Sequence, residues 1–189
     1  MTWLRRPWVR LAVVAVVVAA GLTAWWLSRD EPPMDEALLE SVLPTINEQL
    51  PTTREVAYGG TLTGSDQSLP ARWFCTTTPI EIRRQGTDIR VGLIADCDEY
   101  GHRDGALVRG SGSSGAMMVT VTGEPSAYRL AKVEWGRDGA AHAASIREMF
   151  TPAGARKALQ VEQFGDTPEP TDLARQHFGL PPNAPVLPR

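Results

Sequence analysis

An uncharged run of 17 residues, Leu11 to Leu27, constrains this chain more than any other feature. A helix of that length covers about 26 Å, and adding Trp8 and Val9 brings it close to the ~30 Å thickness of a bilayer's hydrocarbon core. Trp8 and the pair Trp25-Trp26 would then lie at the two headgroup levels, which indole rings prefer. The sequence therefore predicts a transmembrane anchor over 11–27, with a basic leader over 1–10 and a spacer over 28–34.

A long, cleaved signal peptide is the alternative interpretation of the same segment. The candidate cleavage sites are Val18-Ala19-Ala20, which lies inside the apolar run, and Leu22-Thr23-Ala24, which is followed by bulky Trp25-Trp26. Both placements favour retention as an anchor. Three arginines precede the run and only Arg29 follows it. Because basic residues stay on the cytoplasmic side, we expect a single-pass protein of the cell membrane with its N-terminus inside and its body outside the cytoplasm.

The charge of the body excludes one class of partner. Four of the 19 basic residues precede Asp30, whereas all 22 acidic residues lie at or after it, so residues 30–189 carry a formal charge of −7. An acidic body repels the phosphate backbone of nucleic acids. The expected partners are therefore the membrane, through 11–27, and an envelope protein, with no nucleic acid.

The two cysteines, Cys75 and Cys97, fall in the part expected outside the cytoplasm, where a structural disulfide is typical. A free catalytic thiol is the alternative, but His102, His142 and His177 show no recognisable pairing with either cysteine. A disulfide here would contribute about 3 kcal/mol in the chain-entropy model.

The residues between the cysteines predict a β-hairpin about Gly86-Thr87. In that register Ile82 faces Val91 and Ile80 faces Leu93, so the apolar side chains share one face. Continued outward, the register would leave Cys75 one residue out of line with Cys97. We therefore predict a single-residue bulge near Pro79, which cannot donate to the ladder.

Periodicity along the rest of the body predicts an α+β domain over 35–179, with one antiparallel sheet and helices before and after it. A helix is expected over 35–50, kinked by Pro44 or ending near Val42. The expected strands are 54–58, 72–77, 80–84, 89–97, 115–122 and 128–135, and the expected later helices are 141–150, 151–161 and 171–178. The Pro-rich tail, 180–189, is expected to be extended and mobile.

No catalytic or cofactor motif survives inspection, so no cofactor or metal is predicted. Residues 110–115 match G-x-G-x-x-G, but the segment after them is strand-like, which contradicts a dinucleotide site and favours a flexible loop. Polar residues still gather over 96–115. The weak candidates for a ligand region are Asp98, Glu99, His102, Ser111 and Ser113. Asp96 lies on the same side of its strand as Asp98, but no calcium-loop spacing is present, and a solvated acidic edge is the favoured explanation of the cluster.

Part of the body resembles a group of small exported or lipid-anchored proteins of Gram-positive bacteria. The residues that carry the resemblance are Asp98-Glu99-Tyr100, Gly105-Ala106-Leu107, Gly110-Ser111-Gly112-Ser113-Ser114, Met118-Val119-Thr120-Val121, Tyr128-Arg129-Leu130, Asp138-Gly139 and Ile146-Arg147-Glu148-Met149-Phe150. The similarity covers roughly 72–152. This chain departs from the group by its membrane span and by lacking a lipid-anchor cysteine. The resemblance implies export and a shared fold, and no activity.

Two functional hypotheses follow. The first is a membrane-anchored extracytoplasmic domain that binds or scaffolds an envelope component and is not an enzyme. The alternative is a small extracytoplasmic hydrolase or ligand sensor that uses the 96–115 region. A pocket that brings His102 within reach of a serine and a carboxylate would favour the hydrolase.

Overall fold

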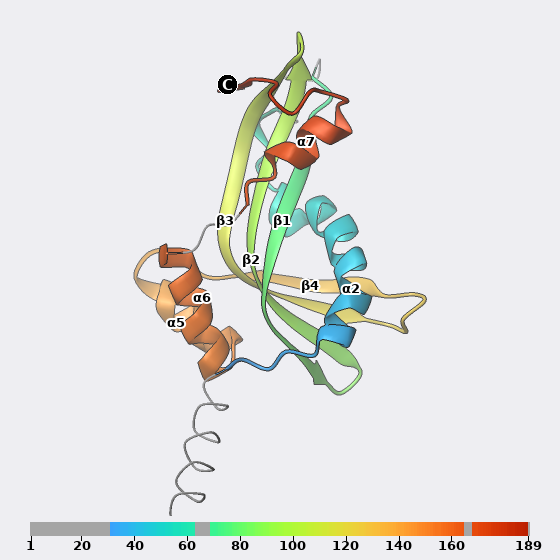
Figure 1. The fold of residues 1–189 in the computed structure, drawn as a ribbon. Helices are drawn as coiled ribbons and strands as arrows, with labels where there is room; N and C mark the ends of the chain where they lie inside the picture. Colours follow the sequence, from blue (N-terminus) through green and yellow to red (C-terminus); the bar gives the residue numbers. More distant parts are fainter. Residues whose placement is uncertain (1–30, 63–68, 165–167, 189) are drawn as a thin grey trace, which may run out of the picture.

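A computed structural model describes residues 31–62, 69–164 and 168–188. The described chain forms an α+β fold around one five-stranded sheet (Figure 1). Four strands run antiparallel in the order β1-β2-β3-β4, and the fifth, β5, pairs with β3. Their bounds are Arg72–Gln85, Asp88–Arg103, Ala106–Thr122, Arg129–Trp135 and Val186–Pro188, from β1 to β5.

The β1-β2 hairpin confirms the local predictions. Gln85 pairs with Asp88 across Gly86-Thr87, and Gly86 adopts the positive φ of 64° that such a tight turn requires. Ile82 pairs with Val91 as expected, and the register shifts between Pro79 and Glu81. The shift leaves Ile80 as the unpaired residue, so Leu93 lies opposite Pro79 and not opposite Ile80. The bulge brings Cys75 opposite Cys97, and a disulfide joins them.

The sheet differs from the prediction in two ways. It is mixed and not purely antiparallel, because β5 runs parallel to β3, with Val186 opposite Leu107 and Pro188 opposite Arg109. The end of the tail is thus fixed to the sheet, contrary to the expected mobile segment. β3 also begins at Ala106, not at Gly115, so residues 110–115 are strand residues and not a loop.

The helices before the sheet also correct the sequence-based assignment. α2 spans Glu36–Gln49 and is capped by Asp35, whose carboxylate accepts from the Leu38 N–H. α2 does not end near Val42. Pro44 has no N–H, so the carbonyl of Glu40 one turn earlier lacks its helical hydrogen bond. Both residues are exposed, and water can bond to that carbonyl instead. After a 3-10 turn at Leu50–Thr52, residues Arg54–Ala57 form the short helix α3 and not the expected strand.

The helices after the sheet were predicted well. They are α5 (His142–Met149), α6 (Pro152–Phe164) and α7 (Thr171–His177), with a 3-10 turn at Gly139–Ala141 before them. Thr151 caps α6, since its hydroxyl accepts from the Gly154 N–H at 3.0 Å.

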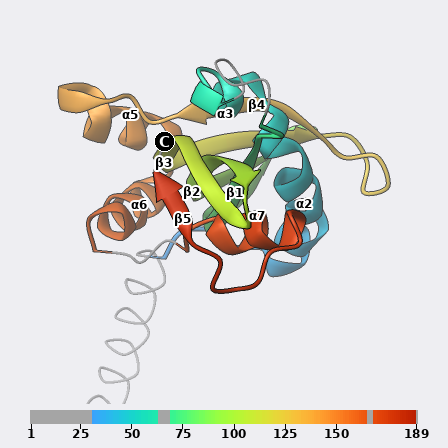
Figure 2. The same ribbon diagram turned by 90° about the horizontal axis from the view of Figure 1, so that it is seen from above.

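Helices cover both faces of the sheet, and Figure 2 shows α2 and α6 on opposite sides of it. We call the side packed by α2 the first face and the side packed by α5, α6 and α7 the second face. The first-face core includes Val42, Ile46, Leu93, Met117 and Val119. The second face has two separate apolar clusters, one under α5 and α6 and one under α7. The polar residues that concern function lie between and beside these clusters.

The predicted anchor over 11–27 falls outside the described residues, as do the leader and residues 28–30 of the spacer. Within the described segments, none of the helices has the length and apolar character needed to cross a bilayer.

Candidate functional site

The part of the sheet farthest from residues 31–34 holds two neighbouring buried carboxylates. This distal half comprises 72–76 of β1, 96–103 of β2 and 106–114 of β3, and it lies uppermost in Figure 1. Asp98 and Glu99 are 1% and 0% exposed and point to opposite faces of β2. The described residues contain one other fully buried carboxylate, Glu81, in the opposite half of the sheet. Charged groups are costly to bury, so each needs a physical account.

Each of the three carboxylates lies against a glycine. A Cβ at Gly154 would collide with the Glu81 carboxylate, one at Gly110 with Glu99, and one at Gly112 with Asp98. The glycines of the Gly110–Gly115 run that precede Ser113 therefore make room for two acidic side chains from the neighbouring strand. Glycine inside a strand often marks such a close approach, but the sequence alone does not show which side chain approaches.

Glu81 has an architectural role. Its carboxylate accepts from the Thr151 N–H at 3.1 Å and from the Thr151 hydroxyl, at the N-terminus of α6. It thereby joins β1 to α6, and a negative charge at that helix end is favourable.

Glu99 holds the first face together in a similar way. One of its oxygens accepts from the Leu62 N–H at 2.9 Å and from the Ser111 N–H at 3.4 Å. The hydroxyl of Thr61 lies 3.5 Å from the same oxygen. Ser111 in turn donates to the Gly59 carbonyl at 3.1 Å, so this carboxylate ties residues 59–62 to β3.

Asp98 differs because its main partner is a partly exposed cation on the second face. Arg109 Nη2 lies 2.7 Å from Asp98 Oδ2, and the Arg109 side chain is 42% exposed. The Tyr100 hydroxyl donates to the same oxygen at 3.2 Å and lies 2.9 Å from Thr171 Oγ1, where either oxygen can donate. Thr171 also donates to Glu169 at 3.3 Å. The network therefore extends from the buried strand β2 to the surface at the start of α7.

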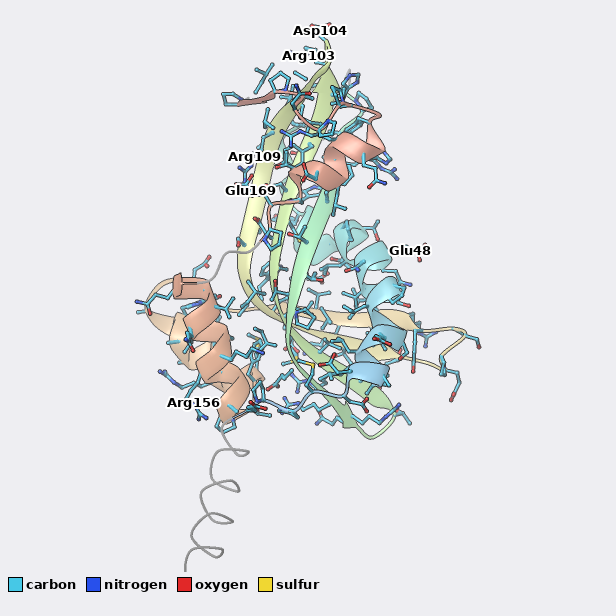
Figure 3. All side chains as sticks on the ribbon, viewed as in Figure 1. Glu48, Arg103, Asp104, Arg109, Arg156 and Glu169 are labelled. Carbon is cyan, nitrogen blue, oxygen red and sulfur yellow. A yellow bond between two sulfur atoms is a disulfide. The ribbon has the colours of Figure 1, made fainter. Side chains whose placement is uncertain are left out.

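A groove opens above this network. Its volume is about 490 Å³, and it is lined by Tyr100, Arg109, Pro168, Glu169, Thr171, Asp172, Arg175 and Val186. Figure 3 shows Arg109 and Glu169 on the same flank of the distal half. Arg175 bonds to Asp172 at 2.8 Å and to the Ala184 carbonyl at 3.0 Å, so α7 and the C-terminal segment form one wall. Charges of both signs thus line a solvent-accessible concave surface.

Ionisation of the groups around Asp98 is perturbed. Burial, the nearby charge of Asp98 and that of Glu169 raise the pKa of Asp96 above its ordinary value, although Arg109 opposes them. Burial raises the pKa of Tyr100 to about 12. Burial lowers the pKa of Arg109, but its hydrogen bond with Asp98 and the charge of Asp98 outweigh that effect and leave the pKa raised. The site therefore presents a permanent cation, a neutral phenol and a carboxylate that holds its proton unusually well.

The structure separates the residues that the sequence analysis grouped together. Asp98 contributes to the groove network, whereas Glu99 and Ser111 lie together on the first face. Ser113 lies on exposed strand opposite Cys97. The His102 ring stacks on Phe178 with centroids 5.9 Å apart, at the α7 end. Among the described residues, no hydrogen bond joins His102 to a serine or a carboxylate, so the arrangement expected of a hydrolase is not formed.

The sequence analysis missed Arg109, Thr171, Glu169 and Arg175. These residues lie close together because the C-terminal chain folds back over the sheet. No local sequence pattern predicts that return. Tyr100 carried a usable signal, since it follows Asp98 at the two-residue spacing that places both on one face of a strand. The described segments bring together no group of three or more His, Cys, Asp or Glu side chains fit to hold a metal ion.

Comparison of the chain with protein-family models, with curated proteins and with solved structures finds no match. The functional conclusion therefore rests on the groove itself.

Proposed function

We propose that this protein is an extracytoplasmic binding domain, fixed to the cell membrane by residues 11–27, that holds an envelope component in the groove beneath α7. The groove presents charges of both signs beside apolar Pro168 and Val186, a composition suited to binding. The expected membrane anchor would keep the domain at the cell surface.

The Asp98–Arg109 pair is the observation that carries the proposal. An ion pair with one partner buried is weak support for stability, because desolvation offsets most of the attraction. Its clearest effect is geometric: Asp98 fixes the direction of the Arg109 guanidinium, whose side chain stays 42% exposed. A guanidinium oriented in advance loses less conformational entropy when a ligand binds.

The place of the groove in the molecule fits a tethered binder. Figure 3 shows Arg156 at the lower end of the molecule, whereas Asp104 lies at the far end, beyond Arg109. The described chain begins at the lower end, close to α6. An anchor before Glu31 would therefore leave the groove on the part of the domain that points away from the membrane.

In-cell crosslinking of the full chain, followed by identification of co-purifying proteins, tests the proposal. We expect one stoichiometric envelope partner whose recovery falls at least fivefold in Arg109→Ala. Arg129→Ala, which removes an exposed arginine on β4, is the matched control and should recover the partner unchanged. A secreted version without 11–27 should also lose the partner. Equal recovery with Arg109→Ala and the intact chain would reject the groove as the binding site.

The raised pKa of Asp96 beside Arg109 supports a second candidate, the hydrolase or ligand sensor of the 96–115 region. In that case Asp96 would exchange protons and Arg109 would stabilise negative charge. Turnover of chromogenic esters or glycosides that is lost in Asp96→Asn would favour this function, and absence of turnover in the intact chain would count against it.

A further inference from the structure

The outer edge of β3 is interrupted between two strands. β4 pairs with β3 over residues 117–122, and β5 pairs with it over 107–109. No strand of the described chain pairs with residues 110–116 on that edge. We call this stretch the β3 notch, and Figure 1 shows it at the margin of the sheet, between α6 and the C-terminal chain. Gly112, Ser113 and Ser114 in the notch are exposed.

Backbone hydrogen-bonding groups point outward from the notch. Both backbone groups of Ala116 face away from β2, since its N–H donates to Glu162 at 2.6 Å and its carbonyl accepts from the Gly136 N–H at 2.9 Å. Alternate residues of a strand face the same way, and the register with β2 is continuous from Gly112 to Met118. The N–H and C=O of Ser114 and Gly112 therefore also face outward. Within the described segments, these four groups have no hydrogen-bond partner in the chain.

Two other edges of the sheet, on β1 and β4, are partly covered within the described residues. The Ile82 N–H of β1 donates to the Pro33 carbonyl at 2.9 Å, and Pro79 removes a donor from the same strand. The Leu130 N–H of β4 donates to the Gln49 side chain at 2.8 Å. Natural proteins guard exposed edges with such covers, with proline or with charged side chains. Residues 110–115 contain only glycine and serine.

The dimensions of the notch limit what can occupy it. Ala116 is already bonded on this edge, so the open part, residues 110–115, spans about 20 Å. A second copy of this edge does not fit, because antiparallel pairing about Ser113 would bring the partner's β4 against this chain's β5. A single extended peptide segment fits, since it can enter and leave the sheet between the two flanking strands.

We infer that the β3 notch binds an extended peptide segment of about four to six residues of an envelope protein, by strand addition to Gly112 and Ser114. Main-chain hydrogen bonds supply the affinity in this mode of recognition. The absence of bulky side chains along the notch lets the incoming backbone approach. The inference refines the proposed binding function by naming a partner class, but it rests on the β3 edge and not on the groove.

Selection of phage-displayed linear heptapeptides against the full chain in lipid nanodiscs tests the inference. Enriched peptides should protect the Gly112 and Ser114 amides from hydrogen exchange. They should bind at least tenfold more weakly to Ser114→Pro, which removes an outward N–H and which an edge strand tolerates. Ser114→Ala is the matched control and should bind the peptides within twofold of the intact chain, because strand addition uses the backbone of Ser114 and not its hydroxyl.

An N-methylated peptide and the Arg109→Ala variant test the inference independently of Ser114→Pro. A peptide N-methylated at alternate residues should lose at least tenfold in affinity, which tests the inference even where Ser114→Pro does not fold. Arg109→Ala should bind the peptides within twofold, whereas loss of binding in that variant would assign them to the groove and overturn the notch while leaving the proposed function intact. Equal binding to Ser114→Pro, equal binding of the N-methylated peptide, or no enrichment would also overturn it.

Discussion

Asp98 and Glu99 are consecutive in the chain and equally buried, yet they lie on opposite faces of β2 and meet different partners. On the first face, the Glu99 carboxylate accepts backbone N–H groups of Leu62 and Ser111. On the second face, the Asp98 carboxylate holds Arg109, which reaches solvent. The Glu99 side joins two parts of the chain, whereas the Asp98 side orients a group that another molecule can contact.

The difference shows how to judge a buried charge from the structure of a single chain. Burial alone does not distinguish the two residues, since both are almost inaccessible. The accessibility of the partner does. A carboxylate bonded to backbone donors inside the molecule contributes to architecture, as Glu81 also does at α6. A carboxylate bonded to a partly exposed guanidinium marks a candidate binding surface.

Glu99→Ala should have the largest effect on stability. It would leave the buried Leu62 N–H without an acceptor and weaken the contact to Ser111, at about 1–3 kcal/mol for each unsatisfied buried group. We expect a loss of about 3 kcal/mol in the free energy of unfolding, measured by urea denaturation with the disulfide intact. Exposed Glu48→Ala is the control and should change stability by less than about 0.5 kcal/mol. A loss below about 1 kcal/mol for Glu99→Ala would refute its architectural role.

Gly112→Ala should have the next largest effect, because its Cβ would overlap the Asp98 carboxylate. Overpacking of this kind costs about 1–3 kcal/mol. Gly101→Ala is a matched control on the neighbouring strand, since its Cβ would meet Leu69 at an ordinary 3.5 Å. Urea denaturation of both variants, together with partner recovery from cells, checks the prediction. If the two alanines cost the same, the glycine does not serve to make room for Asp98.

Asp98→Asn should cost about 1 kcal/mol, since Arg109 is partly exposed and solvent screens the lost charge. The larger consequence should be in the groove, where Arg109 is no longer held in one direction. Partner recovery in cells should fall, while the hydrogen exchange of the Leu62 amide on the other face should remain as in the intact chain. Unchanged partner recovery would remove the distinction between the two faces.

Asp96→Asn should have the smallest effect and the opposite sign. The folded state raises the pKa of Asp96 above 3.8, so the charged form is disfavoured in the folded protein. That penalty is absent below the unfolded pKa, where the group is protonated in both states, and it grows as the pH rises through the folded value. The variant should therefore be slightly more stable than the intact chain at pH 7 and equal to it at pH 3. Thermal unfolding at both pH values measures this, and a destabilised variant at pH 7 would contradict it.

The features predicted correctly from the sequence depend on contacts close together in the chain. The turn at Gly86-Thr87, the bulge near Pro79 and the Cys75–Cys97 disulfide all follow from the strand period applied to one hairpin. The helix α6 begins directly after its predicted cap Thr151, because a capping residue acts within a single turn. The Asp104-Gly105 pair is a second hairpin signal in the sequence. Both residues adopt positive φ and form the turn from β2 to β3.

What the sequence did not reveal depends on distant contacts. Glycine has low strand propensity and serine is common in turns, so Gly110–Gly115 predicts a loop. The need of two β2 carboxylates for the space beside these glycines is a contact between strands, which the local sequence does not show. β5 forms because β3 offers it an edge, and its three residues carry no strand pattern of their own. The groove network likewise joins Tyr100 to Thr171 across 71 positions of sequence. Such contacts are fixed by topology and not by local preference.

The Cys75–Cys97 bond has a consequence for assembly of the domain. A slip of one residue between β1 and β2 would turn every side chain of one strand to the other face, moving Asp98 to the inside of the first core and Glu99 toward the groove. The crosslink joins the two strands in the register that the bulge at Ile80 creates. The disulfide thus holds β1 and β2 in the one alignment that keeps Asp98 and Glu99 on their separate faces.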